Sequence, residues 1–275
     1  MVDKIFIVRH GFRLSWITNN WKSETGLPRD PPLAAYGVAQ AEETARYLAS
    51  LPEYERPTAI FSSPYYRCLQ TSQPIAKALG LPIYVEHGLA EWYSPAKPGS
   101  GLHPRPGSTE SLKTHFAEID PEGWSPVWYP SRKGESVTEV HDRCGGFLST
   151  LIPEVDRRWE NKHQRILLVS HAATTIALIH ELVGDRSDDF RVGCCTLSEL
   201  VKSPGSDTSE SVVGKYKVIK LADGSHMEKG ADREWGFQDV EVHDGMTIDV
   251  GLPGTENDAD YPVGSQINHA KSSNL

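Results

Sequence analysis

Two histidines follow closely on two short apolar runs of the sequence. The run at residues 5–8 is followed by Arg9 and His10, and the run at 166–169 is followed by Ser170 and His171. If both runs are neighbouring parallel strands, their carboxyl ends meet at the crevice where open α/β sheets bind ligands. Two imidazoles in one crevice, with several arginines in the sequence between them, indicate phosphoryl chemistry.

The periodicity of the chain predicts the elements that position these histidines. Strands are expected at 4–8, 59–62, 83–85 and 165–170, and helices at 34–50, 65–79, 135–158 and 172–183. Pro153 should kink or split the third helix. Two later stretches, 197–201 and 216–221, are expected to pair as antiparallel strands. Strands that alternate with helices predict a three-layer α/β fold, in which helices cover both faces of a mainly parallel sheet.

Charge and composition divide the chain into two parts. We predict one domain over residues 1–222 and an acidic, extended tail over 223–275, which holds eleven acidic and three basic residues and so −8 of the net charge of −9. The nearly neutral domain argues against a broad basic face for nucleic acid. The tail is typical of segments that fold on a protein partner. Within the domain, residues 92–133 form a proline-rich insertion without periodicity, expected near the active site.

The remaining composition bounds the setting in which the protein works. No apolar stretch approaches the ~20 residues that span a bilayer, and the apolar run near the N-terminus is too short for a secretory signal. We therefore expect a cytoplasmic or nuclear protein without a membrane partner. The four cysteines have no spacing typical of a disulfide framework or a metal site, so we expect reduced, packed thiols.

Four motifs, in this order, resemble those of the histidine phosphatase superfamily. They are Arg9-His10-Gly11, the stretch from Ser62 to Thr71, Gly134-Glu135-Ser136, and Ser170-His171-Ala172. The resemblance covers roughly residues 4–222, and it implies a phosphoglycerate mutase-like fold. It is strongest to a eukaryotic group that contains suppressor-of-T-cell-signalling phosphatases and the fungal histidine-phosphatase subunit of RNA polymerase III factor C.

The resemblance implies roles that suit the chemistry of these side chains. His10, neutral at one ring nitrogen, attacks phosphorus and holds it as a phosphohistidine. Arg9, Arg13 and Arg67 bind the phosphoryl oxygens with planar guanidinium forks. A protonated His171 binds the same group and stabilises the transition state. No residue cluster suggests a metal, and we expect no cofactor. Gly134-Glu135-Ser136 is interpreted as the start of a helix.

A third catalytic residue must protonate the leaving oxygen. Glu91 follows the predicted strand at 83–85, where the acid lies in the phosphoglycerate mutase-like branch, and Trp92 and a bound phosphate would both raise its pKa. The acid-phosphatase branch instead uses a His-Asp pair and has a proline where this chain has Ser15. Its candidate pairs here, His141-Asp142 and His243-Asp244, lie in a predicted helix and in the tail. We therefore favour Glu91.

Two functions from different classes follow from these observations. The first is a metal-independent phosphomonoesterase that acts through phosphohistidine on a phosphorylated small molecule or phosphopeptide. The second is an interaction subunit of a fungal transcription-factor assembly, with a retained or vestigial phosphatase pocket and a protein partner for the tail. A phosphoglycerate mutase is disfavoured, because Trp16 stands where mutases carry an asparagine. Neither function involves direct contact with nucleic acid.

Overall fold

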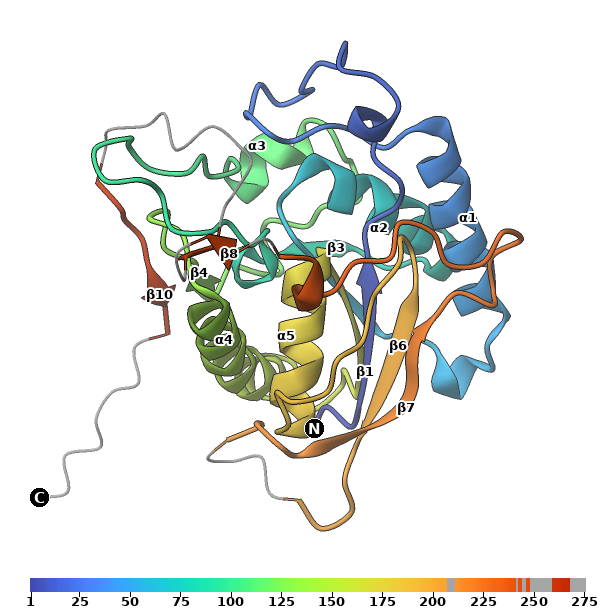
Figure 1. Ribbon diagram of the computed structural model, residues 1–275. Helices are drawn as coiled ribbons and strands as arrows, with labels where there is room; N and C mark the ends of the chain where they lie inside the picture. The colour runs from blue at the N-terminus through green and yellow to red at the C-terminus, as the bar shows by residue number, and fades with distance from the viewer. Residues whose placement is uncertain (207–210, 241, 244–245, 248–258, 268–275) are drawn as a thin grey trace, which may run out of the picture.

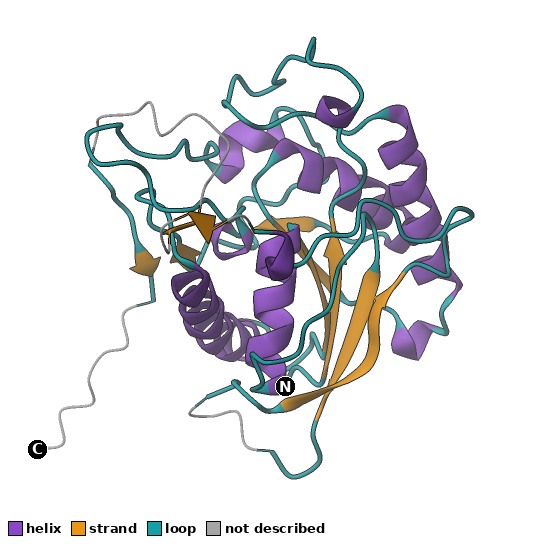
Figure 2. Cartoon of the chain, viewed as in Figure 1, coloured by secondary structure: helices purple, strands orange, loops and turns teal. Residues whose placement is uncertain are grey.

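A six-stranded sheet in the order β3-β2-β5-β1-β6-β7 organises the molecule. The computed structural model describes residues 1–206, 211–240, 242–243, 246–247 and 259–267 (Figures 1 and 2). The strands of this sheet are β1 (Lys4–Arg9), β2 (Ala59–Ser62), β3 (Ile83–Val85), β5 (Arg165–Ser170), β6 (Leu197–Lys202) and β7 (Tyr216–Asp223). The first four run parallel, and β6 and β7 extend the sheet antiparallel to their neighbours, as predicted.

Four long helices cover the two faces of the sheet. They are α1 (Ala35–Ser50), α2 (Tyr66–Leu79), α4 (Val137–Arg158) and α5 (Ala172–Val183). The pairs α1/α2 and α4/α5 lie on opposite sides of the sheet (Figure 1). In β1, Ile5 and Ile7 belong to the core cluster under α4 and α5, whereas Phe6 and Val8 belong to the cluster under α1 and α2. The predicted three-layer α/β fold is confirmed.

The register of two central strands brings the predicted histidines together. β1 and β5 are parallel neighbours, with Arg9 opposite Ser170 at their carboxyl ends. His10 and His171 are therefore the next residue on each strand, and the backbone N–H of His10 donates to the Ser170 carbonyl at 2.9 Å. Since adjacent strands lie about 4.8 Å apart, the two side chains emerge side by side.

The helix α4 begins as expected but continues through its proline. Ser136 and Glu139 form a capping box, in which each side chain accepts from the other residue's backbone N–H, so the prediction of a helix start is confirmed. The helix continues past Pro153 without a break, so this proline does not split it. Ile152 and Val155 are fully buried beside it, and their burial offsets the roughly 3 kcal/mol that an interior proline costs.

The described parts of the insertion and of the tail form short elements, and two of these contact each other. The insertion forms α3 (Thr109–Lys113) and β4 (Trp128–Tyr129), and β4 pairs antiparallel with β10 (Gly264–Ser265) of the tail. Asp260 accepts from the Ser131 hydroxyl at 2.7 Å and from the Arg132 backbone N–H at 3.0 Å. The other short elements are η1 (Leu14–Trp16), η2 (Glu53–Glu55), η3 (His87–Leu89), η4 (Phe237–Asp239), β8 (Val242–His243) and β9 (Met246–Thr247). A domain boundary at residue 222 stays a prediction.

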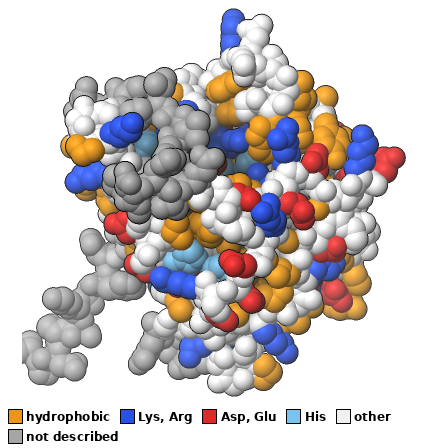
Figure 3. Space-filling view, viewed as in Figure 1, with side chains coloured by type: hydrophobic (Ala, Val, Ile, Leu, Met, Phe, Trp, Pro, Cys, Tyr) orange, Lys and Arg blue, Asp and Glu red, His pale blue; other side chains and the backbone are white. Residues whose placement is uncertain are grey.

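Three further properties predicted from composition concern membrane spans, surface charge and the state of the cysteines. In the part of the chain that the structure describes, every helix is too short or too polar to cross a membrane. On the face seen in Figure 3, lysine and arginine side chains are interspersed with aspartate and glutamate side chains. All four cysteines are buried as free thiols, as the composition predicts.

A buried neutral histidine should make the stability of the fold depend on pH. His87 is buried against the ring of Tyr129, and burial, followed by Arg105, lowers its pKa to about 3. The unfolded chain therefore binds more protons between pH 6.5 and 3, and stability falls as pH drops below 6.5. At pH 5 the neutral His87 lowers the free energy of unfolding by up to about 2 kcal/mol. We expect His87→Phe to flatten the fall in urea-unfolding free energy between pH 7 and 5.

The exposed His115 provides the matched control for this measurement. His115→Gln should keep the wild-type slope of unfolding free energy against pH. Identical slopes for wild type, His87→Phe and His115→Gln would mean that protonation of His87 does not limit stability.

Candidate active site

The nucleophile predicted from the sequence sits in a tight turn after β1. His10 is 2 % exposed, and its Nδ1 atom lies 2.8 Å from the Gly11 carbonyl. A carbonyl only accepts, so Nδ1 carries the proton and Nε2 keeps its lone pair. Burial, Arg67 and His171 lower the pKa of His10 well below its usual range, which keeps this tautomer neutral. A neutral imidazole with a free Nε2 can attack phosphorus.

Two glycines allow the turn after His10 to approach helix α1. A Cβ atom on Gly11 would lie 2.6 Å from the Gly37 carbonyl oxygen, and one on Gly37 would lie 2.2 Å from the Phe12 oxygen. The Gly11 backbone N–H donates to the Thr71 hydroxyl at 3.0 Å. The motif residues around His10 therefore fix the backbone that carries the imidazole.

His171 is held from both ring nitrogens beside His10. Its Nε2 atom lies 2.7 Å from the Ser63 hydroxyl, and its Nδ1 atom lies 3.1 Å from Arg67 Nη2 and 3.2 Å from Glu91 Oε2. Burial lowers the pKa of His171 to about 4, although Glu91 raises it. These surroundings favour a neutral imidazole, contrary to the protonated form expected from the sequence. A phosphoryl dianion between the arginines would shift the balance toward the protonated form.

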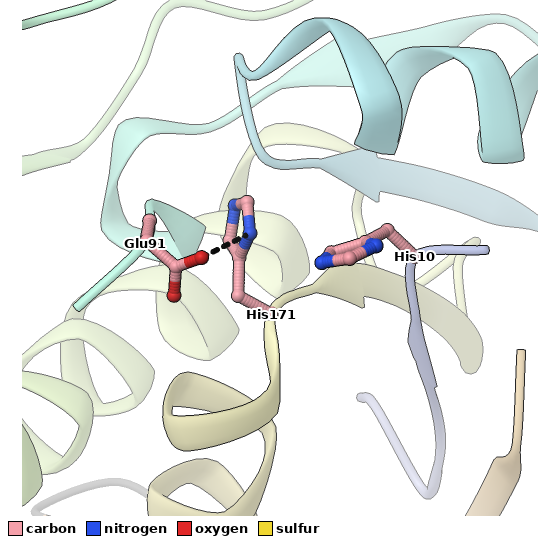
Figure 4. A group of neighbouring side chains, drawn as sticks. All are labelled: His10, Glu91 and His171. Atoms are coloured by element: carbon pink, nitrogen blue, oxygen red, sulfur yellow. Dashed lines mark ion pairs between the residues drawn. The ribbon is translucent and has the colours of Figure 1, made fainter. Parts of the chain in front are cut away.

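Glu91 faces the two histidines from the segment after η3 (Figure 4). Arg67 Nη2 donates to Glu91 Oε2 at 2.9 Å. Burial raises the pKa of Glu91, but His171, Arg67 and Arg13 lower it by more than burial raises it. The pKa therefore lies well below its usual range. The expectation of a raised pKa for Glu91 is therefore wrong when only the protein's own groups surround it, because these groups outweigh burial. A bound phosphate that draws Arg67 away would raise the pKa again.

Three arginines beside His10, Glu91 and His171 each have an Nε–H group without a hydrogen-bond partner. The Nε atoms of Arg9, Arg13 and Arg67 are buried and have no hydrogen-bond partner among the described residues. Arg13 lies over the Trp16 ring at 4.3 Å, and burial, followed by Arg67, lowers its pKa to about 10, which leaves it charged at pH 7. Buried donors without partners are costly, so an anion that accepts from them would be stabilised.

The pocket between these groups encloses about 190 Å³. Its lining residues are Arg9, His10, Arg13, Glu91, Trp92, Ala172, Ala173 and Trp235. Ala172 and Ala173 begin α5, whose N-terminus therefore faces the same space. The structure thus brings together every site residue predicted from the sequence, with Arg67 behind the pocket and bonded to Glu91 and His171.

One acidic residue of the site was missed from the sequence. Asp30 is 1 % exposed, and its two oxygens accept from Arg67 Nη1 at 2.9 Å and from the backbone N–H of Tyr66 at 2.8 Å. It thus satisfies the first turn of α2 and fixes Arg67 at the same time. No sequence pattern connects Asp30 with Arg67, because Asp30 lies in an irregular proline-rich loop. Its position just before the first long helix was the only available signal.

Of the alternative His-Asp pairs, His141-Asp142 lies away from this pocket. His141 lies within α4, where its Nε2 atom is 2.9 Å from Nδ1 of His180. The neighbouring Asp142 is bonded to Arg186 at 2.9 Å. His243 and Asp244 lie outside the residues whose side chains the structure describes. Glu91 is therefore the carboxyl group that the described structure places beside both histidines.

Neutralising Asp30 should weaken catalysis through Arg67. Asp30→Asn keeps an oxygen for the Tyr66 N–H but removes the charge opposite the guanidinium. We expect kcat/KM for an aryl phosphate to fall by about 10- to 100-fold, the scale of a misplaced binding group. Asp185→Asn, which neutralises an exposed acid, serves as the control and should keep the wild-type kcat/KM. If kcat/KM is unchanged in Asp30→Asn, Asp30 only caps the helix.

Comparison with known proteins agrees with this arrangement. The family model for the histidine phosphatase superfamily (branch 1) matches residues 5–212. The transcription factor tau 55 kDa subunit of Saccharomyces cerevisiae is 39% identical over 264 residues, which cover 87% of this chain and 60% of that protein. Human ubiquitin-associated and SH3 domain-containing protein A is 31% identical over 162 residues, 56% of this chain and 23% of that protein. The matched part of the chain covers less than two thirds of the length of either relative.

A solved structure confirms the fold. The ecdysone phosphate phosphatase of Bombyx mori, in complex with tungstate, superposes with a TM-score of 0.56 at 18% identity, over 80% of this chain and 93% of that one. The resemblance that the motifs suggested, including the fungal transcription-factor subunit, is confirmed. The family model covers well over half of the chain, and its range includes both strand-end histidines. The chain belongs to the histidine phosphatase superfamily (branch 1).

Proposed function

We propose that this protein is a metal-independent phosphomonoesterase that acts through a phosphohistidine intermediate on His10. One observation carries the proposal: the buried Nε–H groups of three arginines lack partners among the described residues, around a neutral imidazole whose Nε2 lone pair is free. Arg9 and Arg13 line the pocket with His10, and Arg67 lies against Glu91 and His171, so the three cations can neutralise charge on a phosphoryl group that His10 attacks.

The first displacement forms a phosphorus–nitrogen bond and breaks the phosphorus–oxygen ester bond. His10 Nε2 supplies the electron pair, and the leaving oxygen departs with the bond pair and takes a proton from Glu91. Because the protein's cations keep Glu91 ionised, this proton arrives with the substrate, as a monoanionic phosphate that shares it with the carboxylate. Binding of phosphate by Arg67 raises the pKa of Glu91 at the same moment.

The second displacement restores the free protein. Glu91, now a carboxylate, takes a proton from water, whose oxygen attacks phosphorus as the bond to His10 breaks. Inorganic phosphate leaves, and His10 again donates from Nδ1 to the Gly11 carbonyl. His171 supports both steps through its position against Arg67 and Glu91, which it holds beside the phosphoryl group.

The charges of the site support chemistry without a metal. One ligand atom from each of His10, Glu91 and His171 lies within 4.8 Å of the others, which resembles a three-ligand metal site. However, a divalent cation there would displace Arg67 from Glu91 and would face Arg9 and Arg13. Three guanidinium groups favour an anion instead. No cofactor is invoked.

The names of relatives support a phosphorylated substrate without choosing one. The Drosophila melanogaster ecdysteroid-phosphate phosphatase is 25% identical over 257 residues. By its chemistry, the substrate of this chain is a phosphorylated small molecule or a phosphopeptide, and the setting that we propose is cytoplasmic or nuclear. The test is release of inorganic phosphate from an aryl phosphate, with His10→Ala as control. Equal rates for both proteins would overturn the proposal.

A second function is supported by the yeast relative, which is a subunit of a transcription factor. In this alternative the chain joins a protein assembly through its acidic tail and keeps the phosphatase pocket as an active or vestigial site. Purification of the tagged full chain would test it. Neutralisation of Asp249, Glu256 and Asp258 should deplete specific partners while His10→Ala should not. Identical partner sets for all variants would reject the alternative.

A further inference from the structure

The guanidinium of Arg9 is anchored by two backbone carbonyls from outside its own strand. Its Nη1 atom donates to the Val192 carbonyl at 2.7 Å and to the Arg233 carbonyl at 2.5 Å. Arg9 is 5 % exposed, and its Nε atom has no partner among the described residues. One end of the guanidinium is thus fixed to the protein, and its Nε–H group has no protein partner beside a pocket that Arg9 lines.

The backbone of Arg233, whose carbonyl accepts from Arg9, is left-handed. Arg233 has a φ of 52°, a conformation that costs a non-glycine residue about 1 kcal/mol or more. Its side chain is exposed and lies over the rings of Phe12 and Trp16, at 5.5 and 5.3 Å. The backbone and the side chain of Arg233 therefore make separate contacts near the pocket.

Two residues further on, Trp235 lines the pocket itself. Its backbone forms an antiparallel bridge with Val192, in which each N–H donates to the other carbonyl at 3.0 and 3.1 Å. Its ring centroid lies 6.3 Å from that of Trp92, a second lining residue, and 5.3 Å from that of Phe237. Trp235 and Trp92 thus form an apolar wall beside Glu91, on the side where the leaving group is protonated.

The flanking residues fasten this segment to the domain. The Cys194 N–H donates to the Asp232 carbonyl at 2.8 Å, and Arg191 bonds to Asp239 at 2.6 Å. Phe237 packs against Trp92 and His141, with ring centroids 5.8 and 5.2 Å away. These contacts span both sides of Trp235, so its position against the pocket is set by the fold.

We propose that residues 232–237 are part of the active site, with Arg233 as a positioning residue and Trp235 as a specificity residue. The Arg233 carbonyl holds Arg9 in the orientation that presents Nε to a phosphoryl oxygen. The Trp235 indole contacts the leaving group and favours flat, apolar alcohols, such as phenols, over small polar ones. This inference rests on the proposed phosphatase function for its substrate class, but its positioning step requires only that the pocket binds a phosphate-like oxyanion.

The positioning role is tested by tungstate binding, measured by calorimetry without turnover. Arg233→Gly tolerates the positive φ and removes only the side chain, whereas Arg233→Pro forces φ near −65° and displaces the carbonyl. We expect Arg233→Pro to weaken tungstate binding about 10- to 100-fold, the scale of losing one charged hydrogen bond, and Arg233→Gly to change it less than about threefold. Equal losses in both variants would overturn the role of the carbonyl.

A double-mutant cycle separates positioning from damage to the fold. In an Arg9→Lys background, the carbonyl no longer has a guanidinium to hold, so Arg233→Pro should add little further loss of tungstate affinity. A fully additive loss would mean that Arg233→Pro acts elsewhere, and the positioning role would be rejected.

The specificity role is tested with two substrate types. We expect Trp235→Ala to lower kcat/KM for an aryl phosphate about tenfold through KM, with less than a twofold change for glycerol phosphate, and Trp235→Phe to restore most of the loss. Tungstate has no leaving group, so its affinity should not change in Trp235→Ala. Gln238→Ala, an exposed position directly after this segment, is the control. An equal loss for both substrates would reject the specificity role.

The two readouts distinguish failure of the inference from failure of the proposed function. If the wild-type protein binds tungstate but hydrolyses no phosphomonoester, the proposed function and the specificity role fail, and the Arg233 cycle still decides the positioning role. If wild type and His10→Ala bind tungstate equally weakly, the pocket is not a phosphoryl site and the whole inference is overturned.

Discussion

His10→Ala is expected to abolish both turnover and the covalent phosphoenzyme. The imidazole is the only described group in the pocket with a free nucleophilic lone pair, because Glu91 is bonded to Arg67 and both nitrogens of His171 have partners. His171→Ala should retain a nucleophile but lose a preorganised partner of Arg67 and Glu91, at a cost of about 10³-fold in kcat. The two variants should therefore be similarly inactive but differ in labelling.

The protein is exposed briefly to an aryl phosphate labelled in its phosphoryl group, and parallel samples are quenched in acid and in base. A phosphohistidine is lost in acid and survives base, so label should survive only the basic quench and be absent from His10→Ala. Ser63→Ala is a useful comparison, because it removes only the hydroxyl that orients His171. Label that survives acid but not base would mean that the intermediate is not phosphohistidine.

Glu91→Gln should impair substrates in proportion to the basicity of the leaving group. A phenol with a low pKa leaves without much protonation, so its phosphate ester should lose little activity. An alkyl phosphate leaves as a far stronger base, and the same substitution should lower its kcat by about 10²- to 10⁴-fold, the usual worth of general acid catalysis. Glutamine also keeps an oxygen toward Arg67, which limits the structural disturbance.

Measurement of kcat across a series of aryl and alkyl phosphates gives the slope against leaving-group pKa. The slope should be steeper in Glu91→Gln than in wild type and unchanged in Glu53→Gln, since Glu53 is an exposed residue of η2. An equal loss for all substrates would assign Glu91 a binding role. The donor would then be sought in the insertion, where Glu110 and Asp120 are the first candidates.

Much of the fold follows from local patterns that the sequence carries. The strand and helix positions agree with the predicted ones because each element has a clear hydrophobic period and a stop signal. Gly80 and Gly184, for example, end α2 and α5 in the left-handed conformation, with φ of 65° and 78°. Parallel strands then place His10 and His171 at one edge, so their meeting could also be predicted.

The electrostatic state of the site could not be predicted in this way. Sequence alone suggested a protonated His171 and a Glu91 with a raised pKa, whereas the structure lowers both pKa values. Burial is the main cause at His171, whereas at Glu91 the contacts with His171 at 3.2 Å and with Arg67 at 2.9 Å outweigh burial. A pKa depends on distances of a few ångströms and on burial, and neither is encoded in spacing along the chain.

The sequence by itself determined the fold class, the family and the identities of the predicted site residues, because strand-end motifs are short and local. Only the tertiary structure decided which distant groups support them. Asp30 reaches Arg67 from a loop without periodicity, and the Arg233 carbonyl reaches Arg9 across a separation of 224 residues. Backbone carbonyls and loop acids carry no residue-type signal for such contacts, since their positions arise from packing of the whole chain.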